Sequence, residues 1–154
     1  AGHPRDERLR ASGRACIAEE GWVAHSFAQA TVLRLGGLYG PGRTPTGYLA
    51  GRTDLAGGDQ PVNLVHRDDV IAALVRVIDG SIEGTYNLVA DAHPTRRDFY
   101  TAAAQALGLD PPTFAPSGDP VVGKRISNAN AKDVLGVTFR PLDPERHAED
   151  TAAE

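Results

Sequence analysis

The fold is decided by residues 33–43, which read LRLGGLYGPGR. An apolar, β-branched run leads into them, so the sequence predicts a buried strand over Thr31–Leu35. The strand ends in a turn dense in glycine and proline, where the backbone is exposed. Open α/β sheets bind ligands at the carboxyl edge of such strands. The stretch therefore predicts an α/β fold with a ligand site just after this strand.

Strands and helices alternate along the rest of the chain. We expect further strands over Val62–Val65 and Thr85–Val89, and helices over Pro4–Glu20, Asp68–Gly80, Thr95–Leu107 and a short segment ending at Leu135. This alternation is typical of an α/β fold with a mainly parallel sheet. The strands are few for a whole doubly wound sheet, which indicates that the sheet is small or lacks its first half.

Two local patterns in these helices make sharper predictions. Asp68 is expected to cap the helix that follows it, and Thr95 opens a capping box with Asp98. The helix after Asp68 carries apolar residues at helical spacing, namely Val70, Ile71, Leu74, Val75 and Ile78. We expect this stripe to face the sheet, with Leu74 and Ile78 buried.

The composition argues against several classes of function. A formal net charge of −4 argues against nucleic acid as a partner, because phosphate neutralisation needs a basic face. No apolar run approaches the roughly 20 residues of a membrane span, so no membrane partner is expected. The single cysteine, Cys16, excludes an internal disulfide and fits a cytoplasmic protein. The five histidines lack the spacing of metal ligands, so no metal site is expected.

Five blocks of the sequence can be matched to a known pattern. They are Arg34–Gly42, which reads R-x-x-x-x-Y-G-P-G, Val62–Val70, Gly84–Leu88, Thr95–Leu109 and Ala131–Gly136. In this order they resemble the carboxyl half of an extended short-chain dehydrogenase/reductase of the NAD-dependent epimerase/dehydratase-like family. The resemblance implies a Rossmann-like, mainly parallel sheet with a small C-terminal substrate-binding subdomain. Residues 1–90 would be the C-terminal part of the NAD(P)-binding domain, and residues 91–154 would be the subdomain.

The chain also departs from that family, in ways that make it atypical. The G-x-x-G-x-x-G phosphate turn of the family's amino-terminal half is not found in the sequence. The family's Tyr-x-x-x-Lys pair would fall on the first helix, where Arg10, Ser12 and Arg14 stand, and no tyrosine precedes Tyr39. We therefore assign no catalytic residue. Because the chain contains no methionine and does not begin with one, we expect it to be a processed or fragmentary part of a longer protein.

Two functions remain open at this point. By resemblance, the whole protein would use NAD or NADP as an oxidoreductase or epimerase/dehydratase, acting on a small carbonyl or hydroxyl compound. The alternative is a non-catalytic regulator on the same fold that senses nicotinamide or binds a protein. In either case we expect no cofactor to bind this chain alone, since the phosphate turn would supply much of the anchoring. A homodimer is left open.

A ligand site, if present, is expected at the carboxyl edge of the strands. The expected cofactor contacts are Gly37, Leu38 and Tyr39, and the expected substrate contacts are Arg43, Tyr48 and His66. Glycine permits close backbone approach, and parallel pairing would bring His66 to the same edge as Tyr39. The alternative is that these groups only tie the loop to the sheet. Arg34 is expected to pair with a buried acid such as Asp69.

Overall fold

The computed structural model describes residues 4–44, 46–116 and 123–144. Its elements in chain order are α1 (Pro4–Ser26), β1 (Thr31–Leu35), β2 (Gly37–Tyr39), the 3-10 helix η1 (Thr46–Tyr48), β3 (Leu64–His66), α2 (Arg67–Gly80), β4 (Gly84–Leu88), α3 (Arg96–Ala106) and α4 (Ala129–Leu135). Every predicted helix and strand is therefore present, with ends shifted by a few residues. No helix within the described residues is both long enough and apolar enough to cross a lipid bilayer.

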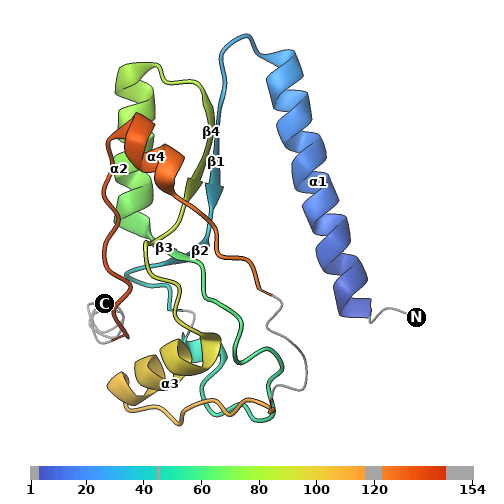
Figure 1. Ribbon diagram of the computed structural model, residues 1–154, viewed down its shortest axis with the longest axis vertical. Coiled ribbons are helices and arrows are strands. Elements are labelled where there is room, and N and C mark those ends of the chain that lie inside the picture. The colour runs from blue at the N-terminus through green and yellow to red at the C-terminus, as the bar shows by residue number, and fades with distance from the viewer. Residues whose placement is uncertain (1–3, 45, 117–122, 145–154) are drawn as a thin grey trace.

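The strands of the described residues form two parallel pairs. β1 pairs with β4, from Thr31 opposite Gly84 to Leu35 opposite Leu88. β2 pairs with β3, from Gly37 opposite Leu64 to Tyr39 opposite His66. In Figure 1, α2 and α4 lie on one side of the β1–β4 pair and α1 on the other, while α3 lies beyond the β2–β3 pair. The structure thus confirms an α/β fold with a parallel sheet.

The buried apolar side chains form two clusters. The first cluster joins β3, β4, α2, α4 and the segment after α4, through Val65, Val70, Ala73, Tyr86, Leu88, Ala131, Leu135, Val137 and Phe139. The second cluster joins β2, β3 and α3, through Tyr39, Val62, Leu64, Ala90, Phe99, Tyr100 and Leu142. The first cluster contains residues from both sides of position 90, so α4 packs with the sheet layer. The proposed division at residues 90 and 91 stays a prediction.

The helix caps follow the sequence in one case and differ in another. Thr95 caps α3, because its Oγ1 accepts a hydrogen bond of 3.1 Å from the Asp98 N–H. The cap of α2 is His66, not Asp68 as predicted, since His66 Nδ1 accepts a 3.1 Å hydrogen bond from the Asp68 N–H. Asp68 instead lies in the first turn, where its charge complements the positive end of the helix dipole.

The predicted orientation of α2 is wrong. Val70 and Ala73 are buried, but Ile71, Leu74, Val75 and Ile78 are 50%, 43%, 48% and 73% exposed. The helix is apolar around most of its circumference, so periodicity alone does not tell which apolar stripe meets the sheet. Val70 and Ala73 pack in the cluster that contains Val65 of β3 and Tyr86 and Leu88 of β4, so this side of α2 meets the strands.

Two leucines test this orientation as a matched pair. We expect Leu88→Ala in β4 to lower the free energy of unfolding by about 2–5 kcal/mol, because Leu88 is fully buried and its removal leaves a cavity. Leu74→Ala should cost less than about 1 kcal/mol, because Leu74 already meets solvent. Urea unfolding of the two variants measures the difference, and equal midpoints would contradict the orientation.

Candidate functional site at the carboxyl edge of the strands

The register of β2 and β3 brings Tyr39 and His66 together. The two ring centroids are 5.1 Å apart and the ring planes are inclined by 81°, an edge-to-face contact. Both side chains are buried, at 3% and 2% exposure. The prediction that they share one edge of the sheet is confirmed. Both rings therefore lie beneath the surface, beside the start of the loop that follows β2.

Gly40 lies directly against this aromatic pair. Its φ of 146° lies in the region that favours glycine, and a Cβ there would lie 3.4 Å from His66 Nε2 and 3.2 Å from Arg67 Cβ. Gly40 and Arg43 exchange two backbone hydrogen bonds, of 3.1 Å and 2.9 Å, which close a tight turn. Arg43 Nε also donates to the Leu38 carbonyl over 3.1 Å. The turn is therefore held over the imidazole by internal contacts, while the Arg43 side chain stays exposed.

Gly36 is required by packing against the backbone of Asn63, and Gly37 lies close to the side chain of Leu64. A Cβ on Gly36 would lie 2.8 Å from the Asn63 carbonyl oxygen, and one on Gly37 would lie 2.6 Å from Leu64 Cδ2. Their N–H groups are also engaged, since Gly36 donates to Leu88 O over 2.9 Å and Gly37 to Asn63 O over 2.8 Å. These two amides thus hold the strands together and do not point at a phosphate-binding position.

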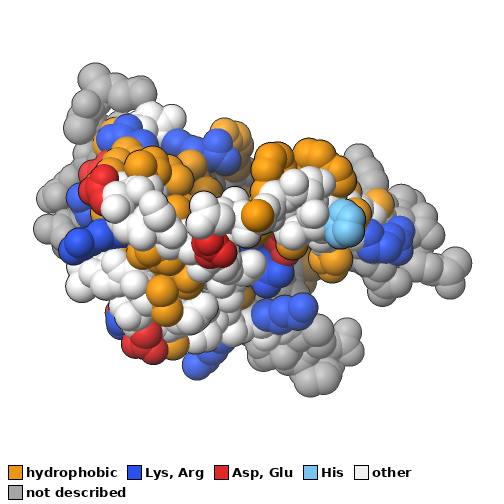
Figure 2. Space-filling model, turned by 90° about the horizontal axis from the view of Figure 1, so that it is seen from above, with side chains coloured by type: hydrophobic (Ala, Val, Ile, Leu, Met, Phe, Trp, Pro, Cys, Tyr) orange, Lys and Arg blue, Asp and Glu red, His pale blue; other side chains and the backbone are white. Residues whose placement is uncertain are grey.

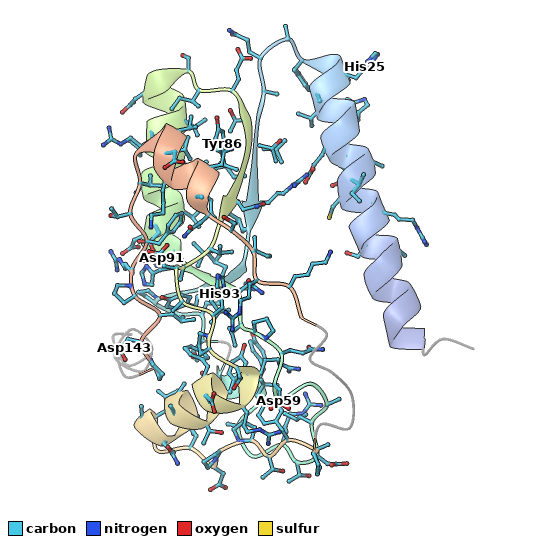
Figure 3. All side chains as sticks on the ribbon, in the orientation of Figure 1. His25, Asp59, Tyr86, Asp91, His93 and Asp143 are labelled. Atoms are coloured by element: carbon cyan, nitrogen blue, oxygen red, sulfur yellow. The ribbon has the colours of Figure 1, made fainter. Side chains whose placement is uncertain are left out.

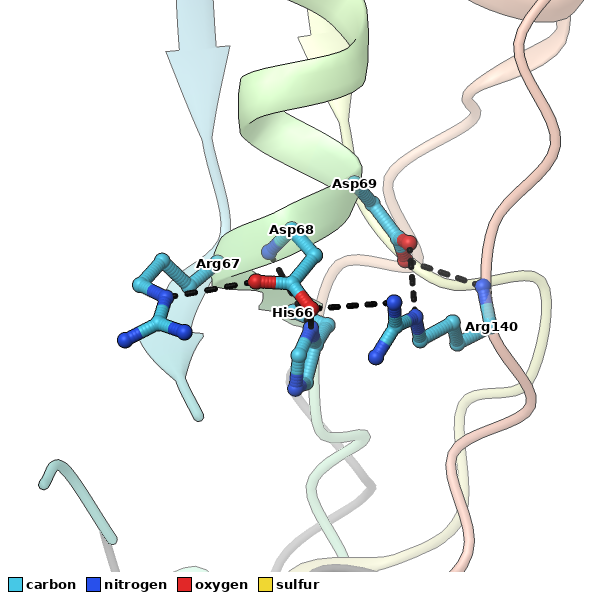
Figure 4. A network of polar contacts seen from close by, with 5 residues as sticks. All are labelled: His66, Arg67, Asp68, Asp69 and Arg140. Atoms are coloured by element: carbon cyan, nitrogen blue, oxygen red, sulfur yellow. Dashed lines mark hydrogen bonds and ion pairs between the residues drawn. The ribbon is translucent and has the colours of Figure 1, made fainter. Parts of the chain in front are cut away.

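A polar network surrounds the start of α2 (Figure 4). The buried Asp69 carboxylate accepts a 2.9 Å hydrogen bond from the Arg140 N–H, and its other oxygen lies 3.4 Å from Arg140 Nε. Arg140 Nη2 lies 3.0 Å from Asp68 Oδ2, and Arg67 Nε donates to Asp68 Oδ1 over 3.3 Å. The network therefore fixes the segment after α4 against the amino end of α2.

The charges of this network lower the pKa of Asp68. Partial burial alone raises the pKa of this carboxyl, but the hydrogen bond from Arg67 and the positive charge of Arg140 outweigh it. The pKa of Asp68 therefore lies below its ordinary value. The carboxylate stays ionised beside His66 at neutral pH.

The remaining predicted contacts do not all meet in one place. Leu38 is half-buried in β2, and Gly37 is exposed. Tyr48 is 76% exposed in η1, on the α3 side of the molecule. The structure thus joins Leu38, Tyr39, Arg43 and His66 around one turn, whereas Tyr48 stands on the neighbouring 3-10 helix. The roles of these residues as ligand contacts stay predictions.

The expected pairing of Arg34 with Asp69 is wrong. Arg34 donates to Glu20 of α1, over 2.9 Å from Nε and 2.5 Å from Nη2, while Asp69 binds Arg140. The hydrogen bond from Arg34 lowers the pKa of Glu20. The Arg34 side chain thus reaches α1, which lies on the other side of the β1–β4 pair from α2 and α4 (Figure 1). Nothing in the linear sequence indicates that Arg34 pairs with Glu20 and not with Asp69.

One polar cluster at this edge could not be predicted from the sequence. Asp91 follows β4, and Figure 3 shows it near His93 at the level where the strand ends. Asp91 Oδ1 accepts hydrogen bonds from Asn128 Nδ2 over 2.7 Å and from Lys132 Nζ over 3.1 Å. The hydrogen bond from Asn128, reinforced by Lys132, lowers the pKa of Asp91 against the opposing effect of partial burial. Because 37 and 41 residues separate the partners, no local pattern signals the cluster.

No group of three or more His, Cys, Asp or Glu side chains in the described part of the chain is placed to hold a metal ion.

Two acids on α2 test the network. We expect Asp69→Ala to lower the free energy of unfolding by about 1–3 kcal/mol, because the Arg140 N–H loses its acceptor in a partly buried place. Asp79→Ala on the same helix is the matched control, since Asp79 is exposed, and it should change stability by less than about 0.5 kcal/mol. Chemical denaturation of both variants gives the comparison. A loss no larger than that of the control would show that the network does not stabilise the fold.

Comparison with known proteins finds relatives over most of the chain. The chain is 41% identical over 136 residues to Protein YeeZ of Escherichia coli (strain K12), which covers 86% of this chain and 49% of YeeZ. It is 32% identical over 123 residues to the 3-diazoavenalumate denitrifying reductase of Streptomyces sp, covering 73% of this chain and 40% of that protein. The chain thus spans about half or less of the length of these curated relatives. No protein-family model matches it.

Solved structures share the fold. A conserved protein of unknown function from Silicibacter pomeroyi DSS matches with a TM-score of 0.70 and 26% identity, over 88% of this chain and 53% of that one. Bordetella bronchiseptica WbmH, solved in complex with NAD+, matches with a TM-score of 0.69 and 20% identity, over 88% and 48%. UDP-N-acetylglucosamine 4-epimerase from Bacillus cereus matches with a TM-score of 0.63 and 13% identity, over 84% and 49%. The chain therefore has a Rossmann-like α/β fold that it shares with an NAD-binding protein and an epimerase.

Proposed function

We propose that this chain is the carboxyl half of an extended short-chain dehydrogenase/reductase-like fold. The whole protein would be an NAD(P)-dependent oxidoreductase or epimerase/dehydratase acting on a small carbonyl or hydroxyl compound. The observation that carries the proposal is the match to WbmH, which was solved with NAD+ and aligns with 88% of this chain. The 32% identity to a reductase supports the same class of reaction.

The described residues fit one wall of a nicotinamide site but not its phosphate anchor. The amides of Gly36 and Gly37 already bind backbone carbonyls, so neither is available to the pyrophosphate, which in this proposal binds a helix start outside the described residues. Leu38 offers a half-buried apolar surface beside the loop, and Tyr39 is positioned by its contact with His66. When bound, NAD(P) would supply or accept the hydride.

The substrate side would be formed by the exposed groups of the loop. The guanidinium of Arg43 presents several N–H donors, of which Nε binds the Leu38 carbonyl, and such a fork suits a carboxylate or phosphate. Tyr48 would add a phenol from η1. His66 and Tyr39 are buried, so in this proposal they position the Gly40–Arg43 turn, and their direct contact with a ligand stays a prediction.

A second candidate is a non-catalytic sensor of nicotinamide on the same fold. The observation that favours it is the composition of α1, where the resemblance expects a tyrosine and the sequence has none. A phenol beside the nicotinamide is the family's proton donor or acceptor, and Ser12 lacks its acidity. Hydride transfer to any carbonyl compound by the whole protein would rule out the sensor.

Cofactor titration tests the proposal on two proteins. The first is this chain alone. The second is this chain joined to the complementary half of Escherichia coli YeeZ, with the two halves in the order in which they occur in YeeZ. We expect no binding of NADH or NADPH to the chain alone at about 100 μM, and binding at or below about that concentration to the joined protein. Calorimetry with both cofactors gives the answer. Low-micromolar binding by the chain alone, or no binding by the folded joined protein, contradicts the proposal.

The contribution of the Tyr39–His66 pair to cofactor binding is tested within the joined protein. Tyr39→Phe keeps the ring contact with His66 and removes one oxygen atom, and Tyr39→Phe with His66→Ala removes the support of the turn. We expect the double variant to weaken NADH binding about tenfold or more, which is roughly 1.4 kcal/mol. Arg52→Ala, an exposed residue of the loop between η1 and β3, is the control and should leave the affinity unchanged. Unaltered binding in the double variant, with its thermal transition preserved, would exclude this edge from the cofactor site.

A further inference from the structure

Two arginines meet at the turn that follows β2. The parallel register of β2 and β3, continued by one residue, sets Gly40 beside Arg67 at the start of α2. A Cβ on Gly40 would lie only 3.2 Å from Arg67 Cβ, and Gly40 exchanges two backbone hydrogen bonds with Arg43. The same glycine is therefore the neighbour of both arginines, and both arginines are exposed.

Each of the two guanidinium groups is anchored at its Nε and open at its other end. Arg43 Nε donates to the Leu38 carbonyl over 3.1 Å, and Arg67 Nε donates to Asp68 Oδ1 over 3.3 Å. Within the described residues, neither arginine uses its Nη1 and Nη2 groups in a hydrogen bond or an ion pair. Such a pair of N–H groups matches the two oxygens of a carboxylate, and an anchored side chain loses less freedom when it binds one.

Arg34 is a useful contrast within the same chain. Its Nε and Nη2 both donate to the carboxylate of Glu20, so a carboxylate already occupies this guanidinium in the bidentate manner. At the amino end of the strands, seen in Figure 2, Lys, Arg, Asp and Glu side chains are dispersed among hydrophobic ones. The two arginines of the turn differ from Arg34, because each keeps its outer N–H groups for a ligand.

The charges around the turn select the class of anion. Arg67 and Arg140 lie on opposite sides of Asp68 (Figure 4), and Arg140 also pairs with Asp69. With Arg43, three positive side chains therefore face two negative ones among the described residues, which leaves one positive charge in excess. One carboxylate balances that excess. A phosphate monoester carries a charge of about −1.5 to −2 at neutral pH and would leave this edge negative.

We infer that Arg43 and Arg67 together bind the carboxylate group of a singly charged substrate, beside the Gly40–Arg43 turn. The inference rests on the proposed function, because that function makes the ligand a substrate, and it narrows the substrate to a small carboxylic acid. Binding of the carboxylate itself requires no cofactor, so it can be measured without NAD(P).

Three ring compounds that differ in their polar group test the inference. They are benzoate, its neutral counterpart benzamide, and phenyl phosphate. Each is titrated into this chain alone and into the joined protein, and nuclear magnetic resonance follows the amides of Gly40 and Arg43 and the Nε–H groups of Arg43 and Arg67. We expect benzoate to bind with a dissociation constant of about 1–10 mM. Benzamide and phenyl phosphate should bind at least about fivefold more weakly.

Charge-matched variants identify the groups that bind benzoate. Arg43→Gln and Arg67→Gln should each weaken benzoate binding by about fivefold or more, because each removes one pair of donors. Arg67→Lys, which keeps the charge but not the planar pair of N–H groups, should lie in between. Arg76→Gln on the exposed side of α2 is the control, since it removes the same charge from the chain, and it should change the affinity by less than about twofold. Thermal unfolding of each variant verifies that the fold is kept.

Several results would overturn the carboxylate site. They are no benzoate binding in either protein, equal binding of benzamide, tighter binding of phenyl phosphate, and equal losses in the Arg43→Gln and Arg76→Gln variants. These outcomes are distinct from those of the cofactor titration. Benzoate binding that depends on both arginines, without cofactor binding by the joined protein, leaves the carboxylate site standing and removes the proposed function. Cofactor binding without benzoate binding removes the site and leaves the function standing.

Discussion

The structure depends on the close approach of the chain at two adjacent glycines. Gly36 gives its N–H to Leu88 of the first strand pair, and Gly37 gives its N–H to Asn63 beside the second. Side chains at either position would overlap Asn63 or Leu64. The step from Gly36 to Gly37 therefore joins both strand pairs, and it fixes the start of β2, which carries Tyr39 and leads into the loop with Arg43. Because the N–H groups of both glycines bind backbone carbonyls at this crossing, the presence of two glycines alone is no evidence of a phosphate site.

Much of the fold could be predicted from the sequence because its signals are local. The run before Gly36 fixes a strand by periodicity, and the hydroxyl of Thr95 lies three residues from the amide that it caps. Parallel pairing then places His66 beside Tyr39, since the strand ends are shared. These constraints are short-range or follow from the strand topology, so they do not depend on contacts with residues far away in the sequence.

The rest depends on partners that lie far away in the sequence. Asp69 meets Arg140 and Asp91 meets Lys132 across 71 and 41 residues, and no spacing rule selects those pairs. The orientation of α2 could not be read from periodicity, because the helix carries apolar residues on both its buried side and its exposed side. The sequence predicts the acidic Asp68 as the cap of α2, whereas the imidazole of His66, two residues earlier, accepts the hydrogen bond from the Asp68 N–H. In the candidate site, the sequence could predict which residues meet but not whether their side chains are exposed. Tyr39 and His66 lie together as expected, but both are buried.

The alternation of β3 has a mechanical consequence. Leu64 points into the cluster with α3, and Val65 points into the cluster with α2 and α4, so a single short strand forms a wall of both. Neither cluster can slide or rotate against the other without displacing the backbone that both share. A displacement of β3 would therefore change the packing of both clusters, and with it the packing of α3 against the sheet.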